Sequence, residues 1–177
     1  MQKRDFLRVA AAGALSTLAP GVMAQPAKPA AKKLIPTIAH NLIGVDSTGA
    51  KIDLDDLAGK VCLISFFTFD CSSCMEDLRL MREFYVGNKQ KNFSMIGVNT
   101  ERHKKDYLEL MGLLNKTIPE SNRFPIVWRN APEHHDTFGP LKTNPTHFVI
   151  NKAHKQVLRR DGLFRAEDWD DLWTSLG

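Results

Sequence analysis

The chain contains one nearly unbroken apolar run, Val61-Cys62-Leu63-Ile64-Ser65-Phe66-Phe67, and a pair of cysteines follows it as Cys71-Ser72-Ser73-Cys74. An apolar run of this length predicts a strand that is buried on both faces at the centre of an α/β sheet. After the second cysteine, apolar residues recur at helical spacing at Leu78, Met81 and Tyr85. The sequence therefore predicts a dithiol at the junction between a central strand and the N-terminus of a helix.

The spacing of the two cysteines predicts redox chemistry. Cysteines at positions i and i+3 can form a disulfide, and its small ring opens and closes readily. Cys71 is expected at the positive end of the helix dipole, where backbone N–H groups favour a thiolate. Cys74 is expected one turn inside the helix, where it is better shielded. We therefore predict that Cys71 attacks the sulfur of a partner and that Cys74 resolves the mixed disulfide.

The same two thiols could also serve a structural or metal-binding purpose. A structural disulfide is disfavoured because so short a loop removes little chain entropy. A structural zinc site needs four ligands, and no second C-x-x-C or nearby H-x-x-x-H provides them. Copper binding remains an alternative, with Met75 and His147 as additional ligands to the two thiols. The redox hypothesis needs no cofactor or metal, and it treats Cys62 as a small buried hydrophobic residue.

The remaining pattern predicts alternating strands and helices. Two segments, 41–44 and 51–54, flank a turn-forming cluster and predict an N-terminal hairpin. After the first helix, the pattern predicts a strand at 93–99, a helix at 107–114 and a short strand at 125–128. A mixed segment at 130–141 follows, with one turn of helix at 134–138. A hairpin of strands at 146–150 and 156–160 comes next, and a helix at 167–176 closes the domain.

The first residues read as an export signal. Lys3, Arg4 and Arg8 precede a mildly apolar run of about fifteen residues, which is too short for a membrane span of roughly 20 residues. We predict cleavage after Ala24, so that residues 1–24 are a signal peptide and residues 25–36 a flexible linker rich in Pro, Ala and Lys. The start is also similar to a twin-arginine signal with one arginine replaced by lysine. Export predicts the periplasm, where disulfides persist, and no integral membrane segment remains after processing.

Composition indicates an ordinary globular domain. The 177 residues are 43% hydrophobic and 25% charged, with a net charge of +4 to which the leader contributes. Charges of both signs alternate along the chain, and no basic stripe with interleaved aromatic residues occurs. A nucleic-acid partner is therefore not expected.

Several segments together resemble the TlpA/ResA-like branch of the thioredoxin superfamily, which are exported thiol–disulfide oxidoreductases. The similarity covers nearly all of residues 38–177. It rests on Gly59-Lys60-Val61 before the central strand, on Phe124-Pro125, on Asn144-Pro145-Thr146-His147-Phe148-Val149-Ile150, and on 155–162, in addition to C-x-x-C.

The resemblance implies a thioredoxin fold over residues 37–177, an α/β fold with a central mixed sheet flanked by helices, to which this chain adds the N-terminal hairpin. It implies a cis peptide bond before Pro145, which would face the dithiol, and an acidic residue that assists proton transfer. Asp77 has the better spacing for that role and Glu76 is the other candidate; either carboxylate would also suit the helix N-terminus. The implied partners are a protein disulfide and a membrane redox protein that recycles the cysteines.

The sequence departs from the family pattern beside the cysteines. Asp70 replaces the usual Trp, and a carboxylate next to a thiol disfavours the thiolate. The intervening residues, Ser72 and Ser73, include no His that would stabilise a thiolate, which favours a reductase over an oxidant. Phe67-Thr68-Phe69-Asp70-Cys71 is also similar to the peroxiredoxin pattern, although Ile64 stands where that pattern has proline, and peroxide reduction remains an alternative.

This interpretation also predicts the positions of four further side chains. Met75 is expected to pack beneath the active site. His147 is expected to point outward from its strand, and His134-His135 are expected on the surface.

Overall fold

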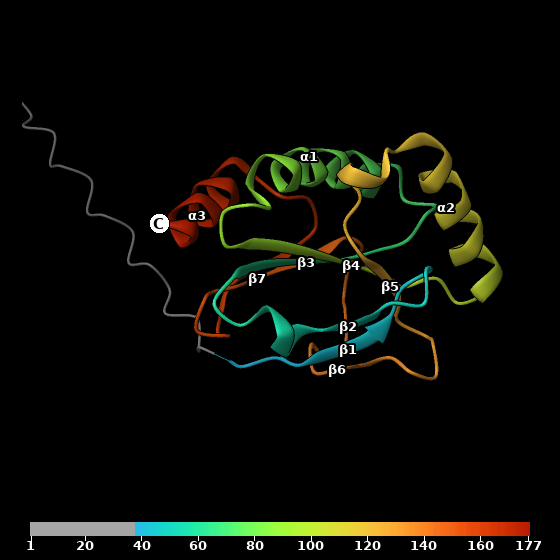
Figure 1. Cartoon of the computed structure of the whole chain (residues 1–177), viewed down its shortest axis with the longest axis horizontal. Coiled ribbons are helices and arrows are strands. Elements are labelled where there is room, and N and C mark those ends of the chain that lie inside the picture. The colour runs from blue at the N-terminus through green and yellow to red at the C-terminus, as the bar shows by residue number, and fades with distance from the viewer. Residues whose placement is uncertain (1–37) are drawn as a thin grey trace, which may run out of the picture. The chain divides into compact units, whose positions relative to one another are not determined.

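The structure, a computed structural model, describes residues 38–177 (Figure 1). The predicted signal peptide 1–24 and the predicted linker 25–36 lie outside the described residues. None of the helices in the described part of the chain is long and apolar enough to cross a membrane.

A five-stranded mixed sheet occupies the centre of the part that the structure describes, in the order β5-β4-β3-β7-β8. The strand β3 lies in the middle, parallel to β4 and antiparallel to β7. Of the two outer strands, β5 is parallel to β4 and β8 is antiparallel to β7. The strands are β3 (Val61–Phe67), β4 (Phe93–Asn99), β5 (Ile126–Trp128), β7 (Thr146–Ile150) and β8 (Gln156–Asp161).

The two faces of this sheet are covered by different kinds of element (Figure 1). Helices α1 (Ser72–Asn88), α2 (Lys104–Thr117) and α3 (Ala166–Leu176) contribute to the buried cluster on one face. The opposite face carries a small sheet in the order β2-β1-β6, together with the short 3-10 helix η1. The bounds of these elements, with the second 3-10 helix η2, are β1 (Leu42–Val45), β2 (Lys51–Asp53), η1 (Leu54–Leu57), η2 (Glu120–Asn122) and β6 (His135–Asp136).

Burial of β3 on both faces explains its apolar sequence. Leu63 and Phe67 belong to the cluster on the helical face, whereas Ile64 and Phe66 belong to the cluster on the other face. Successive side chains of a strand point to opposite sides, so a strand covered on both sides needs apolar residues at every position. The exception is Ser65, a polar residue that is fully buried.

Most of the predicted elements are confirmed, including the N-terminal hairpin of β1 and β2 and the hairpin of β7 and β8. The expected turn of helix at 134–138 is wrong, because β6 forms there and pairs antiparallel with β1. The Asp136 carboxylate holds this segment: it accepts hydrogen bonds from Arg129, from His134 and from the Phe138 N–H. His134 is therefore buried rather than on the surface as expected, whereas His135 is exposed.

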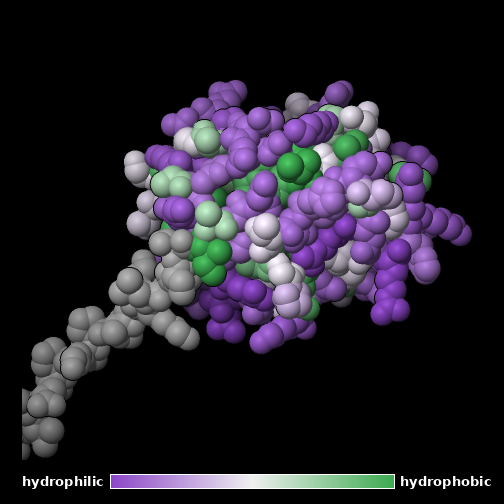
Figure 2. Space-filling model, turned by 90° about the horizontal axis from the view of Figure 1, so that it is seen from below, coloured by the Kyte–Doolittle hydropathy of each residue, from purple (hydrophilic) through white to green (hydrophobic). Residues whose placement is uncertain are grey.

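The side of the small sheet is mostly hydrophilic. Hydrophilic side chains cover most of the face shown in Figure 2, and hydrophobic ones appear there in small separate groups. Within residues 38–177, the two apolar clusters lie inside, between the central sheet and the elements that cover it.

A close approach of strands at Gly97 gives a test of this packing. A Cβ atom at this position would lie 2.9 Å from Ile126 Cγ1 and 3.1 Å from Phe124 Cε2. We expect Gly97→Ala to lower the free energy of unfolding by about 1–3 kcal/mol, since an added methyl group overpacks the core. Urea unfolding measures this change.

The matched control is Gly87→Ala, in helix α1, where a Cβ atom would have no neighbour within 4 Å. That variant should be as stable as the parent protein or more stable by up to about 1 kcal/mol, because Ala is the better helix former. Equal effects of the two substitutions would contradict the packing described for β4.

The pH dependence of stability tests the contacts of Asp136. Burial alone would raise the pKa of this carboxyl, but its hydrogen bonds with His134 and Arg129 lower the pKa from 3.8 to about 2. This stabilisation is present above about pH 4 and is lost as the pH falls through about 2; in magnitude it corresponds to about 2 kcal/mol. In urea unfolding, Asp136→Asn should be less stable than the parent protein at neutral pH, and the difference should shrink toward pH 2. A difference that does not change with pH would contradict this assignment.

Candidate active site

The loop between β3 and α1 is held in place by the segment that follows β4. The backbone N–H of Thr100 donates to the carbonyl of Phe67 at 2.8 Å, and the N–H of Phe69 donates to Glu101 Oε1 at 2.6 Å. These contacts fix the chain just before Cys71, which is the N-cap residue of α1. The cysteine pair is thus located at the end of the central strand, as the sequence predicted.

Cys71 and Cys74 form a disulfide. Cys71 is half-buried, whereas Cys74 is fully buried. Cys71 Sγ accepts the backbone N–H of Cys74 at 3.1 Å and lies 3.4 Å from Ser73 Oγ. In the reduced protein, the same N–H and the helix dipole would stabilise a thiolate on Cys71. The partly accessible sulfur is therefore the one with the better setting for nucleophilic attack.

Asp70, which precedes the pair, is exposed. Water and salt screen a charge in that position, so its effect on the neighbouring sulfur is smaller than that of a buried carboxylate. The argument from Asp70 for a less stable thiolate is accordingly weaker than the sequence alone indicated.

Pro145 lies beside the end of β3. The peptide bond between Asn144 and Pro145 is cis, and the residue is buried. It immediately precedes β7, and in the antiparallel pairing of β7 with β3, Thr146 lies opposite Phe66. Pro145 is therefore level with Phe67, at the end of the strand that leads to the cysteines.

Of the two candidate carboxylates, only Asp77 turns into the interior. Glu76 is exposed and forms an ion pair with Arg79 at 2.7 Å. Asp77 is buried, one turn after Cys74 and on the same side of α1. The first turn of α1 contains no acidic residue. The alternative role, in which Glu76 or Asp77 stabilises the helix N-terminus, therefore does not apply to either carboxylate.

The partner of Asp77 is His147, and here the sequence-based expectation was wrong. His147 is fully buried, and its Nε2 lies 3.1 Å from Asp77 Oδ2. It does not point outward, because both faces of β7 are covered and every residue of the strand is buried. The apolar residues Phe148, Val149 and Ile150, which continue the strand, are the signal that could have shown this.

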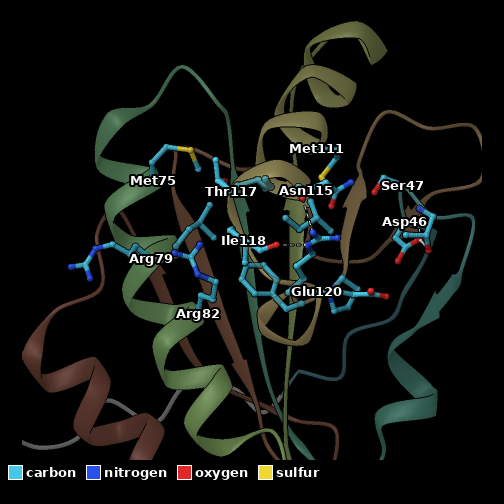
Figure 3. Close-up of a pocket in the computed structure, with 17 residues that line it drawn as sticks. Asp46, Ser47, Met75, Arg79, Arg82, Met111, Asn115, Thr117, Ile118 and Glu120 are labelled. Carbon is cyan, nitrogen blue, oxygen red and sulfur yellow. Dashed lines mark hydrogen bonds between the residues drawn. The ribbon is translucent and has the colours of Figure 1, made fainter.

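A pocket of about 480 Å³ lies between α1 and the C-terminal part of α2 (Figure 3). Met75, which directly follows Cys74, lies at its edge, and Met111 and Ile118 line it from the α2 side. Met75 also packs against the helical-face core, in agreement with its expected position. No Cys or His lines the pocket; its lining combines apolar side chains with charged ones such as Arg82 and Glu120.

The third cysteine, Cys62, is separate from this site. It is fully buried in β3 on the opposite face of the sheet, and burial raises the pKa of its thiol to about 12. It is therefore a hydrophobic core residue, as predicted. Within residues 38–177, no group of three or more His, Cys, Asp or Glu side chains is arranged to hold a metal ion.

Curated proteins similar to this chain carry the name thiol–disulfide oxidoreductase ResA. The Bacillus anthracis protein is 30% identical over 124 residues, which are 67% of this chain and 65% of that protein. The Bacillus subtilis (strain 168) protein is 27% identical over 124 residues, 67% of this chain and 63% of that protein. This chain thus spans just under two thirds of the length of these relatives, and the expected resemblance to the ResA-like branch is confirmed.

Solved structures agree on the fold. A putative thiol:disulfide interchange protein DsbE from Chlorobium tepidum superposes with a TM-score of 0.62 at 22% identity, over 77% of this chain and 94% of that one. A thiol:disulfide interchange protein of the thioredoxin family from Chlorobium tepidum TLS gives a TM-score of 0.64 at 20% identity, over 81% of this chain and 98% of that one. The expected thioredoxin fold is confirmed. Residues 32–158 match the AhpC/TSA family, and the chain therefore belongs to that family.

Proposed function

We propose that this protein is an exported thiol–disulfide oxidoreductase that acts on protein disulfides, more readily as a reductase than as an oxidant. The observation that carries the proposal is the disulfide at the start of α1, with Cys71 half-buried as the N-cap and Cys74 fully buried. The names of the ResA relatives support the same chemistry.

In the proposed reaction, the Cys71 thiolate attacks one sulfur of a substrate disulfide. A mixed disulfide forms between Cys71 and the substrate, and the other substrate sulfur leaves as a thiolate that takes up a proton. Cys74 then loses its proton and attacks Cys71 Sγ, which releases the second substrate sulfur. The substrate gains two electrons and two protons, and the enzyme returns to the Cys71–Cys74 disulfide.

Two buried residues have assigned roles in this cycle. Asp77 accepts the proton of Cys74, because it is a buried carboxylate one helical turn away on the same side of α1. Pro145 borders the site where a substrate peptide would lie, and its lack of an N–H leaves neighbouring backbone groups free to pair with that peptide.

The direction and the compartment are part of the same proposal. The C-x-x-C segment contains Ser72 and Ser73 and no His, so no imidazolium stabilises the reduced form as a strong oxidant requires. The sequence of residues 1–24 reads as an export signal, and a thiol reductase in the periplasm would need a membrane redox partner to reduce Cys71–Cys74 again.

Equilibration in glutathione redox buffers tests this function on the protein without residues 1–24. We expect a single two-electron transition of the Cys71–Cys74 pair with a midpoint well below about −200 mV, which is the range of reductants. Cys71→Ser should abolish turnover of an insulin-type disulfide substrate, whereas Cys62→Ser should leave turnover unchanged. A midpoint near about −120 mV would contradict the direction, and a pair that never cycles would contradict the function itself.

A further inference from the structure

Asp77 and His147 form a pair in the interior of the domain. Their side chains are 5% and 0% exposed, and His147 Nε2 lies 3.1 Å from Asp77 Oδ2. The ring of Phe164 packs edge-on against the imidazole, with 5.4 Å between the ring centroids. A carboxylate in such a setting is expensive to desolvate unless hydrogen-bond donors face it.

Both hydrogen bonds that Asp77 receives end on the same oxygen. The backbone N–H of Phe164 donates to Oδ2 at 2.9 Å, and His147 Nε2 contacts that oxygen as well. Among the described residues, Oδ1 has no hydrogen-bond partner. The two contacts fix the orientation of the carboxylate through Oδ2, while Oδ1 keeps its capacity to accept a proton.

The polar groups on the neighbouring strands do not replace His147 as the side chain that contacts Asp77. From β8, Arg160 lies opposite His147 in the strand pairing, but its guanidinium is bound by Asp168 of α3, with Nε–Oδ2 at 2.6 Å and Nη2–Oδ1 at 2.8 Å. From β3, Ser65 lies opposite His147 and does not ionise in this range. On the same side of α1, Cys74 lies one turn before Asp77, and Tyr85, two turns after Asp77, packs against the same cluster.

We infer that His147 is a positioning residue for the resolving step: its Nε2–H holds Oδ2 of Asp77, so that Oδ1 stays available to take the proton of Cys74. This inference rests on the proposed function. In the step, the S–H bond of Cys74 breaks and its proton moves to Asp77 while the Cys74 sulfur bonds to Cys71 Sγ. The bond between Cys71 and the substrate sulfur breaks, and that sulfur leaves with the electron pair. The imidazole touches no reacting atom and acts only through Asp77.

The test uses the reduced protein and the aromatic disulfide reagent DTNB in stopped-flow mixing. The first released thiolate reports the attack of Cys71, and the second reports the attack of Cys74 on the mixed disulfide. Because the released aromatic thiolate needs no proton, the second phase isolates the deprotonation of Cys74. Both rates are measured from about pH 5 to about pH 9, the range in which a general base changes state.

We expect His147→Leu to slow the second phase by about tenfold near pH 6, and its acid limb to move to higher pH, with the first phase unchanged. His147→Gln should behave like the parent protein, since the amide nitrogen can donate to Asp77 as Nε2 does. Asp77→Asn should cause at least as large a loss as His147→Leu. The double variant should be no slower than Asp77→Asn alone, because a residue that acts through Asp77 has no effect without it.

His134→Gln is the matched control. His134 is another buried imidazole that contacts a carboxylate, at 2.8 Å from Asp136 Oδ2, but it belongs to the contacts of β6 and not to the cysteine site. This variant should change neither phase. Urea unfolding of every variant separates a loss of stability from a change in the pH profile.

Three results would overturn the inference while leaving the proposed function intact. These are an unchanged second phase in His147→Leu, a loss in His147→Gln equal to that in His147→Leu, and a further loss when His147→Leu is added to Asp77→Asn. If His147→Leu does not fold, His147→Asn replaces it, because its shorter amide cannot reach Asp77. Failure of the proposed function would look different: the parent protein itself would release no second thiolate.

Discussion

The chemistry of this chain depends on the junction at which β3 ends and α1 begins. At that point Cys71 is the N-cap of the helix, and its sulfur accepts the N–H of Cys74. A helix start leaves backbone N–H groups without partners, and here one of them is directed at a sulfur atom. The difference between the two cysteines, one accessible and polarised and the other buried, follows from this geometry alone.

The position of the junction is in turn fixed by the burial of the strand that leads to it. Both faces of β3 are buried, each in one of the two apolar clusters, and the segment after β4 holds the loop between β3 and Cys71. The start of α1 is therefore anchored to the central strand of the sheet rather than to an edge strand. The same construction brings β7 alongside β3, with Pro145 immediately before β7 and His147 within it.

The sequence predicted this part of the structure because its signals are local. Hydrophobic periodicity identified β3 and α1, and the cysteine spacing identified the site, since both depend on residues close together in the chain. The failures involve pairings between distant segments. β6 forms because it pairs with β1, some ninety residues earlier in the chain. The local sequence around His134 and His135 has no apolar alternation that would predict this strand. His147 was expected to point outward because polar and apolar positions alternate on a strand with one exposed face. Both faces of β7 are covered, so all of its residues are buried.

The most direct measurement of the central claim is the order in which the two active-site thiols react. The fully reduced protein would be treated with limiting iodoacetamide at neutral pH, and the alkylated cysteine identified by mass spectrometry after digestion. Cys71 should carry nearly all of the early modification, because its sulfur is accessible and favoured as a thiolate, and Cys74 should react much more slowly. Equal rates at the two cysteines, or earlier modification of Cys74, would contradict the assignment of Cys71 as the attacking thiol.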